Sequence, residues 1–308
     1  MSTIKSFSVG NGDMFYINHS SDNFTIIDCC YEDEWQRDKL FDSIKQLSKK
    51  KGITRFISTH PDEDHIKGLE ILDNMIGLLN FYVVKNEAVK NDEETDNFVR
   101  YCSLRDDPKK AFYVYKGCRR KWMNLGSDKN DKEQRGCSGI NYLWPITTNP
   151  DFQEALKRVK NGDDFNNISP ILTYSLNNGI KAIWMGDMET SFLDKIKNEI
   201  DWPKVDVLFA PHHGRKTGHV SSDVLDKMAP KVIVIGEAPS KDLDYYNNYE
   251  TIKQNSAGDI TFVAERGKVD VYVENTSYGY NVSSFHNDGL NNTEDGKYLG
   301  SFTPHAAE

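Results

Sequence analysis

Short apolar runs separated by polar turn residues dominate the first sixty positions of the chain. The runs "IKSFSV", "MFYIN" and "NFTIID" predict three strands, the last ending at Asp28. A helical spacing follows, which places Trp35, Phe41 and Leu47 on one face expected to be buried. "RFIS" predicts a short buried strand, and "HIKGLEILDNMIG" predicts one helix beginning at His65.

The same alternation of strands and helices resumes after about residue 138. Strands are predicted at "INYLWPI", "SPILTYSL", "KAIWMGD", "VDVLFAPHHG" and "KVIVIGE", and helices at "SFLDKIKNEI" and "SSDVLDKMA". "GDITFVAE" and "KVDVYVE" predict a closing hairpin. Strands that alternate with helices in this way indicate an α/β fold with layered sheets.

Two segments depart from this pattern and define the expected domain organisation. Residues from about 86 to 138 are rich in Lys, Asp, Asn and Arg without clean periodicity, which indicates an insertion or a long elaborated loop. Residues 276–308 are polar and are expected to form a C-terminal appendage. We therefore predict a single domain over residues 1–275 that carries the insertion.

Composition narrows the class of protein. The net charge of −9 argues against wrapping long nucleic acid by electrostatics alone, although a local basic groove remains compatible with it. Five cysteines without C-x-x-C spacing fit reduced thiols better than a disulfide framework. The N-terminus has no apolar signal region, and no run approaches the roughly 18 apolar residues of a membrane span. A soluble, cytoplasmic protein that does not associate with membranes is expected.

The stretch "STHPDEDHIKG", residues 58–68, carries the candidate chemistry. Side chains two apart on an extended loop point the same way, so His60, Asp62 and Asp64 can converge. His65 follows at the predicted helix start and can turn in beside Asp64. Imidazole and carboxylate groups together are good ligands for zinc or manganese. The simpler alternative is a solvated acidic turn.

Two later strand ends add candidates of the same kind. Asp187 follows the apolar strand "KAIWM", and His212 and His213 follow "VDVLFA". Taken singly, such an aspartate is usually a turn or helix-cap residue, and such a histidine pair is usually structural. Three strand ends that supply a His/Asp cluster, an Asp and a His could together complete two metal sites sharing one carboxylate.

The ordered motifs resemble the metallo-β-lactamase superfamily, and within it the ComEC-like branch of soluble hydrolase domains. The matching stretches are "VGNGD", "TIID", "THPDEDHIKGL", "NNISPILTYSLNNG", "MGD" and "LFAPHHGRKT", which follow the family order over roughly residues 4–240. The resemblance implies a four-layer αββα sandwich with a two-metal site at its edge.

The resemblance also implies a set of ligands for two divalent metal ions, Zn²⁺ or Mn²⁺. Carried over to this chain, one ion is held by His60 and Asp62, the other by Asp64, His65 and one of His212 and His213, with Asp187 bridging. His213 is favoured as the ligand and His212 as a substrate-facing or proton-donating residue, with the reverse assignment open. Asp64 and His212 are the predicted catalytic residues. Asp13 and Asp28 are expected to orient ligands or form turns.

Departures from the family pattern bear on the metal and the substrate. Asn167 stands where other branches supply a histidine, and Asp62 stands where many relatives have a second one. The first site is therefore oxygen-rich, which makes Mn²⁺ or Mg²⁺ as credible as Zn²⁺. Asn167, Arg215 and Lys216 are predicted to contact substrate, the alternative for the two cations being solvated loop charges.

The predicted activity is hydrolysis by a hydroxide that bridges the two ions. A phosphodiesterase or nuclease that acts on nucleic acid or a nucleotide is the leading hypothesis. Two alternatives stay open: a hydrolase of a lactone, thioester or β-lactam, and a partner-gated or non-catalytic module that retains the metal site. In the last case a protein partner would bind through the insertion or the C-terminal tail.

Overall fold

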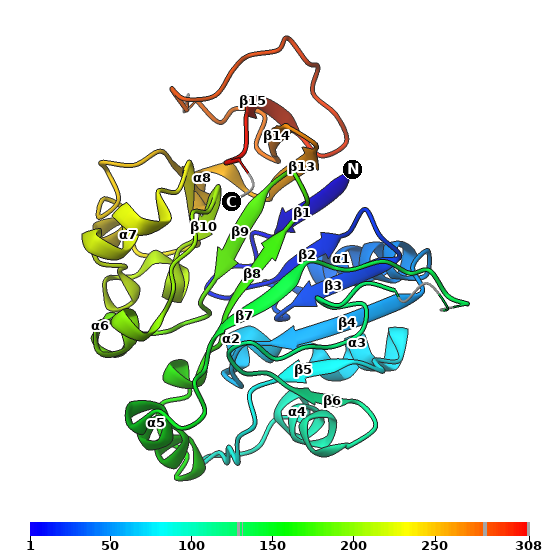
Figure 1. The fold of residues 1–308 in the computed structure, drawn as a ribbon, viewed down its shortest axis with the longest axis vertical. Helices are drawn as coiled ribbons and strands as arrows, with labels where there is room; N and C mark the ends of the chain where they lie inside the picture. The colour runs from blue at the N-terminus through cyan, green and yellow to red at the C-terminus, as the bar shows by residue number, and fades with distance from the viewer. Residues whose placement is uncertain (128–129, 131, 280–281, 307–308) are drawn as a thin grey trace.

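The protein, seen in a computed structural model that describes residues 1–127, 130, 132–279 and 282–306, contains two β-sheets (Figure 1). Within these residues the first sheet has nine strands in the order β15-β14-β13-β1-β2-β3-β4-β5-β6, and the second has six in the order β12-β11-β10-β9-β8-β7. The strands are β1 (Ser2–Ser6), β2 (Phe15–Asn18), β3 (Asn23–Ile27), β4 (Ile53–Ser58), β5 (Phe81–Val83), β6 (Ala111–Tyr113), β7 (Ile140–Trp144), β8 (Ile171–Ser175), β9 (Lys181–Trp184), β10 (Val207–Phe209), β11 (Val232–Ile235), β12 (Thr251–Lys253), β13 (Ile260–Glu265), β14 (Lys268–Val273) and β15 (Lys297–Phe302).

Aromatic side chains join the inner faces of the two sheets. Phe15 on β2 packs edge-on against Phe209 on β10, with ring centroids 5.0 Å apart, and against Trp184 on β9 at 6.1 Å. Phe209 also meets Phe262 on β13. All four side chains are buried, and this apolar layer between the sheets holds the sandwich together.

Helices cover the outer faces and complete the layers. Phe81 of β5 packs against Tyr101 of α4, and Trp144 of β7 packs against Phe152 of α5, so each sheet is covered by helices on the side away from the other. The helices are α1 (Glu34–Ser48), α2 (Glu63–Ile66), α3 (Leu69–Ile76), α4 (Asp96–Asp106), α5 (Pro150–Lys160), α6 (Thr190–Ile196), α7 (Ser222–Met228) and α8 (Gln254–Ala257). The predicted α/β class, an αββα sandwich, is confirmed.

Parallel strands bring the candidate residues to one edge. β3, β4, β5 and β6 run parallel in the first sheet, as do β9, β10, β11 and β12 in the second. Asp28 and His60 follow β3 and β4, while Asp187 and His213 follow β9 and β10. Because carboxyl ends of parallel strands lie on one side of a sheet, four chain segments distant in sequence meet there.

The helix predicted to begin at His65 is divided in two. Gly68 adopts φ 89°, a left-handed conformation that most side chains disfavour, and it separates α2 from α3. A Cβ at this position would approach Phe41 and Tyr31 to 2.8 Å, so the close packing of α1 also requires glycine. The break lets His65 belong to a short turn at the sheet edge while α3 covers the sheet.

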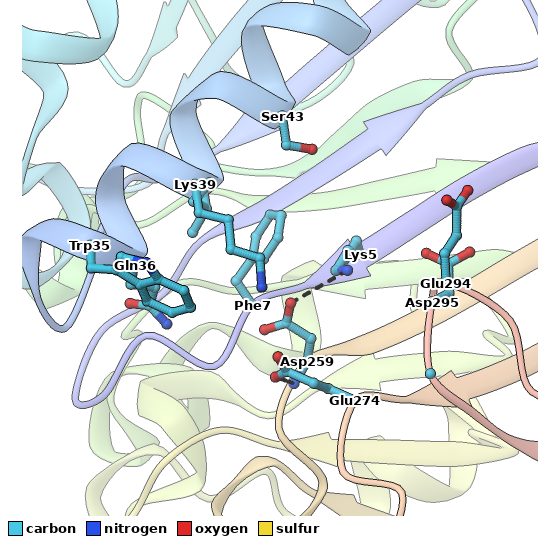
Figure 2. Close-up of a pocket in the computed structure, with 12 residues that line it drawn as sticks. Lys5, Phe7, Trp35, Gln36, Lys39, Ser43, Asp259, Glu274, Glu294 and Asp295 are labelled. Carbon is cyan, nitrogen blue, oxygen red and sulfur yellow. Dashed lines mark hydrogen bonds and ion pairs between the residues drawn. The ribbon is translucent and has the colours of Figure 1, made fainter.

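Trp35 was predicted on the buried face of α1, and this prediction is wrong. Its side chain is 72% exposed, although Phe41 on the same helix is fully buried. Figure 2 shows Trp35 with Gln36 and Lys39 at a hollow of about 270 Å³, where Lys5 and Asp259 form an ion pair at 3.4 Å. Trp35 lies in the first turn of the helix, at the edge of this hollow, so its side chain does not pack into the hydrophobic core.

Both segments with irregular composition contribute regular structure. The segment from about 86 to 138 supplies α4 and the edge strand β6, which pairs in parallel with β5. Near the C-terminus, β15 pairs antiparallel with β14 and completes the first sheet. The division into a domain, an insertion and an appendage stays a prediction. Among the described residues no helix is long and apolar enough to cross a membrane.

Candidate metal centre

Strained backbone marks the loop that follows β10. His212 and His213 have φ values of 51° and 56°, both in the left-handed region, and lie in the turn η3 (Pro211–Gly214). For a residue other than glycine this conformation costs about 1–2 kcal/mol. Two successive residues held there direct the two imidazoles to the edge where β4 and β9 also end, and such strain is concentrated at functional sites.

Asp187 lies at the centre of the cluster. Its Oδ1 is 3.1 Å from Nε2 of His65, and its Oδ2 is 3.2 Å from Nε2 of His213. The rings of His60 and His65 have centroids 4.1 Å apart, and those of His65 and His213 are 5.2 Å apart. His65, Asp187, His213 and Asp13 each offer a ligand atom, and the four atoms lie within 4.8 Å of one another.

The atoms that face this centre lack hydrogen bonds within the described part of the chain. They are Nε2 of His60, His65 and His213 and Oδ1 of Asp187, all of them buried. A buried polar atom without a hydrogen bond costs about 1–3 kcal/mol, so four such atoms in one cluster require an explanation. A divalent cation would satisfy them, since imidazole nitrogen and carboxylate oxygen are the ligands that zinc and manganese accept.

The opposite ring nitrogens are held by hydrogen bonds. Nδ1 of His65 lies 2.9 Å from Oδ2 of Asp28, and Nδ1 of His213 lies 3.1 Å from Oδ1 of Asp13. Asp28 also accepts hydrogen bonds from the backbone N–H and hydroxyl of Thr59. A carboxylate on Nδ1 places the lone pair on Nε2, the tautomer that a metal requires. Asp13 and Asp28 are therefore placed to orient the two imidazoles.

His60 is oriented by hydroxyl groups instead. Its Nδ1 lies 3.1 Å from Oγ1 of Thr59 and 3.4 Å from Oγ of Ser169, which precedes β8. Its Nε2 lies 3.3 Å from Oδ2 of Asp62. Thr59 could have been noticed because it adjoins His60 in sequence, whereas Ser169 lies in the matching stretch "NNISPILTYSLNNG" but no spacing connects it with His60.

Without a cation, the negative charge of the carboxylates in the cluster is balanced by its histidines. Burial opposes a proton on His65 and His213, but Asp187 between them, with Asp28 and Asp13 behind, raises the pKa of both rings well above the usual range. Burial likewise opposes ionisation of Asp187 and Asp64, yet the same histidines lower both carboxyl pKa values, that of Asp64 to about 2. Protons thus stand where a metal would supply positive charge.

Asp62, Asp64 and His212 form the solvent side of the cluster. The two aspartate side chains are 37% and 38% exposed, and Oδ2 of Asp64 lies 3.6 Å from Nε2 of His213. His212 is half-buried, its Nε2 3.7 Å from Oδ2 of Asp187 and its Nδ1 2.9 Å from the hydroxyl of Thr217. Burial lowers the pKa of His212 despite the neighbouring carboxylate, so this ring is neutral at pH 7.

The predicted substrate-binding residues have different positions. The Asn167 amide donates to Asp164 and Glu189 and its oxygen accepts from the backbone of Glu189, so this side chain is occupied by structural hydrogen bonds. Arg215 and Lys216 follow the histidine pair after Gly214 and border a cavity of about 490 Å³. Arg215 and Lys216 therefore lie at a cavity next to the histidine loop, where contact with substrate stays a prediction, whereas Asn167 has a structural role in the loop before β8.

Gly186 allows the Asp187 and His60 loops to approach each other. It has φ 52°, and an added Cβ would lie 2.6 Å from Oγ of Ser169 and 2.8 Å from Cβ of Thr59, the two residues that hold His60. We expect Gly186→Ala to cost about 1–2 kcal/mol for the left-handed backbone and about 1–3 kcal/mol for overpacking. Denaturant unfolding and metal stoichiometry measure the two consequences, lower stability and weaker metal binding.

Gly77 supplies the matched control for that substitution. It also has a left-handed backbone, φ 65°, but open space surrounds the position of an added Cβ. Gly77→Ala should therefore lose stability by the backbone contribution alone and keep the metal content of the parent protein. Equal metal content in Gly186→Ala and Gly77→Ala would contradict a role of Gly186 at the cluster.

The buried histidine–aspartate cluster lies at the shared carboxyl edge of an αββα sandwich, the arrangement that the sequence resemblance to the metallo-β-lactamase superfamily implies. No protein-family model matches the sequence, and no curated protein matches it. Among solved structures, the chain is similar to the metallo-β-lactamase fold protein YhfI from Bacillus subtilis, with 11% identity and a TM-score of 0.44 over 82% of this chain and 95% of that one. It is also similar to a long form RNase Z from yeast, with 12% identity and a TM-score of 0.36.

The second of these superpositions covers 76% of this chain and 37% of the yeast protein, so the chain spans little more than a third of that relative. Both likenesses are remote. The fold assignment rests on the two facing sheets, their strand order and the outer helices described above.

Proposed function

We propose that this protein is a metal-dependent hydrolase that cleaves phosphodiester bonds. The observation that carries the proposal is a cluster of buried imidazole nitrogens around the carboxylate of Asp187, whose facing atoms lack hydrogen bonds within the described residues. The loop that supplies His213 continues into Arg215 and Lys216, which line a cavity. A site that combines bound cations with guanidinium and ammonium groups suits a substrate with negative charge on its reacting centre. A lactone or β-lactam would need no such positive surroundings.

In this proposal Asp187 would serve both of two divalent ions. His65 and His213 would hold one ion, together with Asp64, whose carboxylate lies near His213. His60 and Asp62 would hold the other. His213 is preferred over His212 as ligand because its Nε2 is buried, lacks a hydrogen bond within the described chain and is nearer to Asp187.

Bound in this way, the ions would lower the pKa of water and neutralise charge that develops on phosphate oxygens. Hydrolysis forms one P–O bond from water oxygen and breaks the P–O bond to the leaving group, which takes a proton. His212 can serve the substrate: with Nδ1 accepting from Thr217, its Nε2, which lies 3.7 Å from Oδ2 of Asp187 at the half-buried side of the cluster, carries the proton and can donate to a phosphoryl oxygen. Asp13 and Asp28 keep the ligand imidazoles in the required tautomer.

The first test is hydrolysis of a simple phosphodiester reporter by the purified protein with Mn²⁺ or Zn²⁺ added. Turnover is expected with the phosphodiester and should be at least about tenfold faster than with a matched carboxylic ester, lactone or β-lactam, since Arg215 and Lys216 assist only the anionic substrate. Preferential turnover of a carbon electrophile would contradict the proposal. Stoichiometric metal without turnover of any of these compounds would instead indicate a non-catalytic metal protein.

A further inference from the structure

The open cavity next to the loop that carries His212 is lined by two chain segments with three cations. Arg215, Lys216 and Thr217 line one side, and Lys241 and Asp242 line the other, around about 490 Å³. Within the described residues Lys216 and Lys241 form no ion pair, and Nε of Arg215 is buried without a hydrogen-bond partner. Three positive charges facing one carboxylate leave the cavity with an excess of positive charge.

The same two segments meet again at an aromatic stack. The ring of Tyr245 lies parallel to that of His219, with centroids 3.7 Å apart and an angle of 17° between the planes. Tyr245 is 47% exposed, so much of its ring remains accessible to solvent. The stack lies three residues beyond Lys216 on one segment and four residues beyond Lys241 on the other, so the aromatic ring and the cations come from the same two neighbouring segments.

Hydrogen bonds anchor these two segments. The Tyr245 hydroxyl donates to the carbonyl of Val220, and the Tyr246 hydroxyl accepts from the backbone N–H of the same residue. The hydroxyl of Thr190 donates to the carbonyl of His219. Thr217, at the other end of the loop, contacts His212. These hydrogen bonds connect the stack to the elements around it and the cavity residue Thr217 to His212 of the cluster.

We propose that Lys216, Lys241 and Tyr245 form a subsite for single-stranded nucleic acid, with a phosphate in the basic cavity and a base stacked on Tyr245. Aromatic side chains bind unpaired bases by stacking, whereas the bases of a duplex are already stacked on one another. The overall charge of −9 confines favourable contacts to this local patch, so the subsite spans only a few nucleotides. The inference rests on the proposed function, because it identifies the substrate of the same cluster.

The test is binding of a fluorescent, phosphorothioate-linked decathymidylate to the metal-loaded protein, compared with an abasic strand of equal length. Tyr245→Leu should weaken decathymidylate binding about tenfold, the typical contribution of one stacked base, and leave the abasic strand unaffected. Tyr245→Phe is the matched control, since it removes the hydrogen bond to Val220 but keeps the ring, and it should bind as the parent does. Equal binding of decathymidylate by Tyr245→Leu and the parent would overturn the proposal.

Salt dependence tests the phosphate contact separately. Lys241→Gln should reduce the slope of log affinity against log salt by about 0.7 for both strands, the value for one phosphate contact on a single strand. Lys49→Gln, at the end of α1 on the opposite edge of the first sheet, should leave the slope unchanged. An unchanged slope in Lys241→Gln, or duplex DNA bound as tightly as the single strand, would contradict the subsite.

The outcomes separate this inference from the proposed function. A protein that hydrolyses the phosphodiester reporter but binds decathymidylate no more tightly than the abasic strand contradicts the subsite alone. A protein that shows the expected binding pattern but hydrolyses no phosphodiester contradicts the proposed function alone.

Discussion

Asp187→Ala is expected to remove stoichiometric metal binding and to lower phosphodiester hydrolysis by more than about 100-fold. Loss of residues that merely orient metal ligands costs about 10–100-fold in metal affinity or activity, and Asp187 is a proposed ligand of both ions. Its two oxygens face His65 and His213 at 3.1 and 3.2 Å, so its removal separates the two imidazoles from their common partner. Metal analysis of the purified protein and the initial rate on the reporter measure the effect.

Two variants control for this substitution. Asp187→Asn keeps the shape of the side chain but removes its charge, and it should also lose metal while melting within a few degrees of the parent. Asp201→Ala removes an aspartate whose side chain is almost fully exposed and whose ion pair is with Lys116, and it should keep both metal and activity. Full metal content in Asp187→Ala would show that the ions are held elsewhere in the protein.

Removing the metal with a chelator is expected to abolish hydrolysis and to destabilise the protein more at pH 8 than at pH 5.5. In the metal-free protein the raised pKa values of His65 and His213 contribute stability that is fully present below the unfolded value of about 6.5 and is lost as the pH rises through the folded values. Above that range Asp187 and its neighbouring carboxylates repel one another without compensation. A metal ion restores the positive charge at any pH where it binds.

The expected size of the destabilisation on metal removal follows from mass action. A ligand at 100 times its Kd stabilises the folded state by about 2.7 kcal/mol, which corresponds to a shift of a few degrees in Tm for a protein of this length. Melting curves with and without chelator at both pH values measure this shift in Tm. Adding Mn²⁺ or Zn²⁺ back should restore the original Tm. A chelator effect that is equal at the two pH values would contradict the assignment of His65 and His213 to the metal.

Local spacing explains why much of the cluster could be predicted. His60, Asp62, Asp64 and His65 stand within six residues, so the loop between β4 and α2 brings them together whatever the rest of the fold does. Strand periodicity likewise predicts that Asp187 follows a strand end. The assignment of each residue to one of two ions stays a prediction, because it depends on atoms that converge from four separate segments.

Other features depend on contacts that leave no trace in the sequence. Ser169 orients His60 across the sandwich, and Gly186 is required because Ser169 and Thr59 leave no room for a Cβ. Trp35 has the spacing of a buried position but lies in the first turn of α1, at an open hollow. Tyr245 stands 26 residues after His219 and stacks on it only because the loop after β11 folds back over the loop after β10.

The sequence by itself determined the order of many of the strands and helices, the layered α/β class and the residue types at the strand ends, because periodicity and short-range spacing are properties of neighbouring residues, while the αββα arrangement was implied by the family resemblance. Only the tertiary structure decided which nitrogen of each histidine faces the centre, which described atoms there lack partners, and that the Lys216 and Lys241 segments share one cavity. Those properties arise from the packing of one sheet against the other, and packing joins residues that are far apart along the chain.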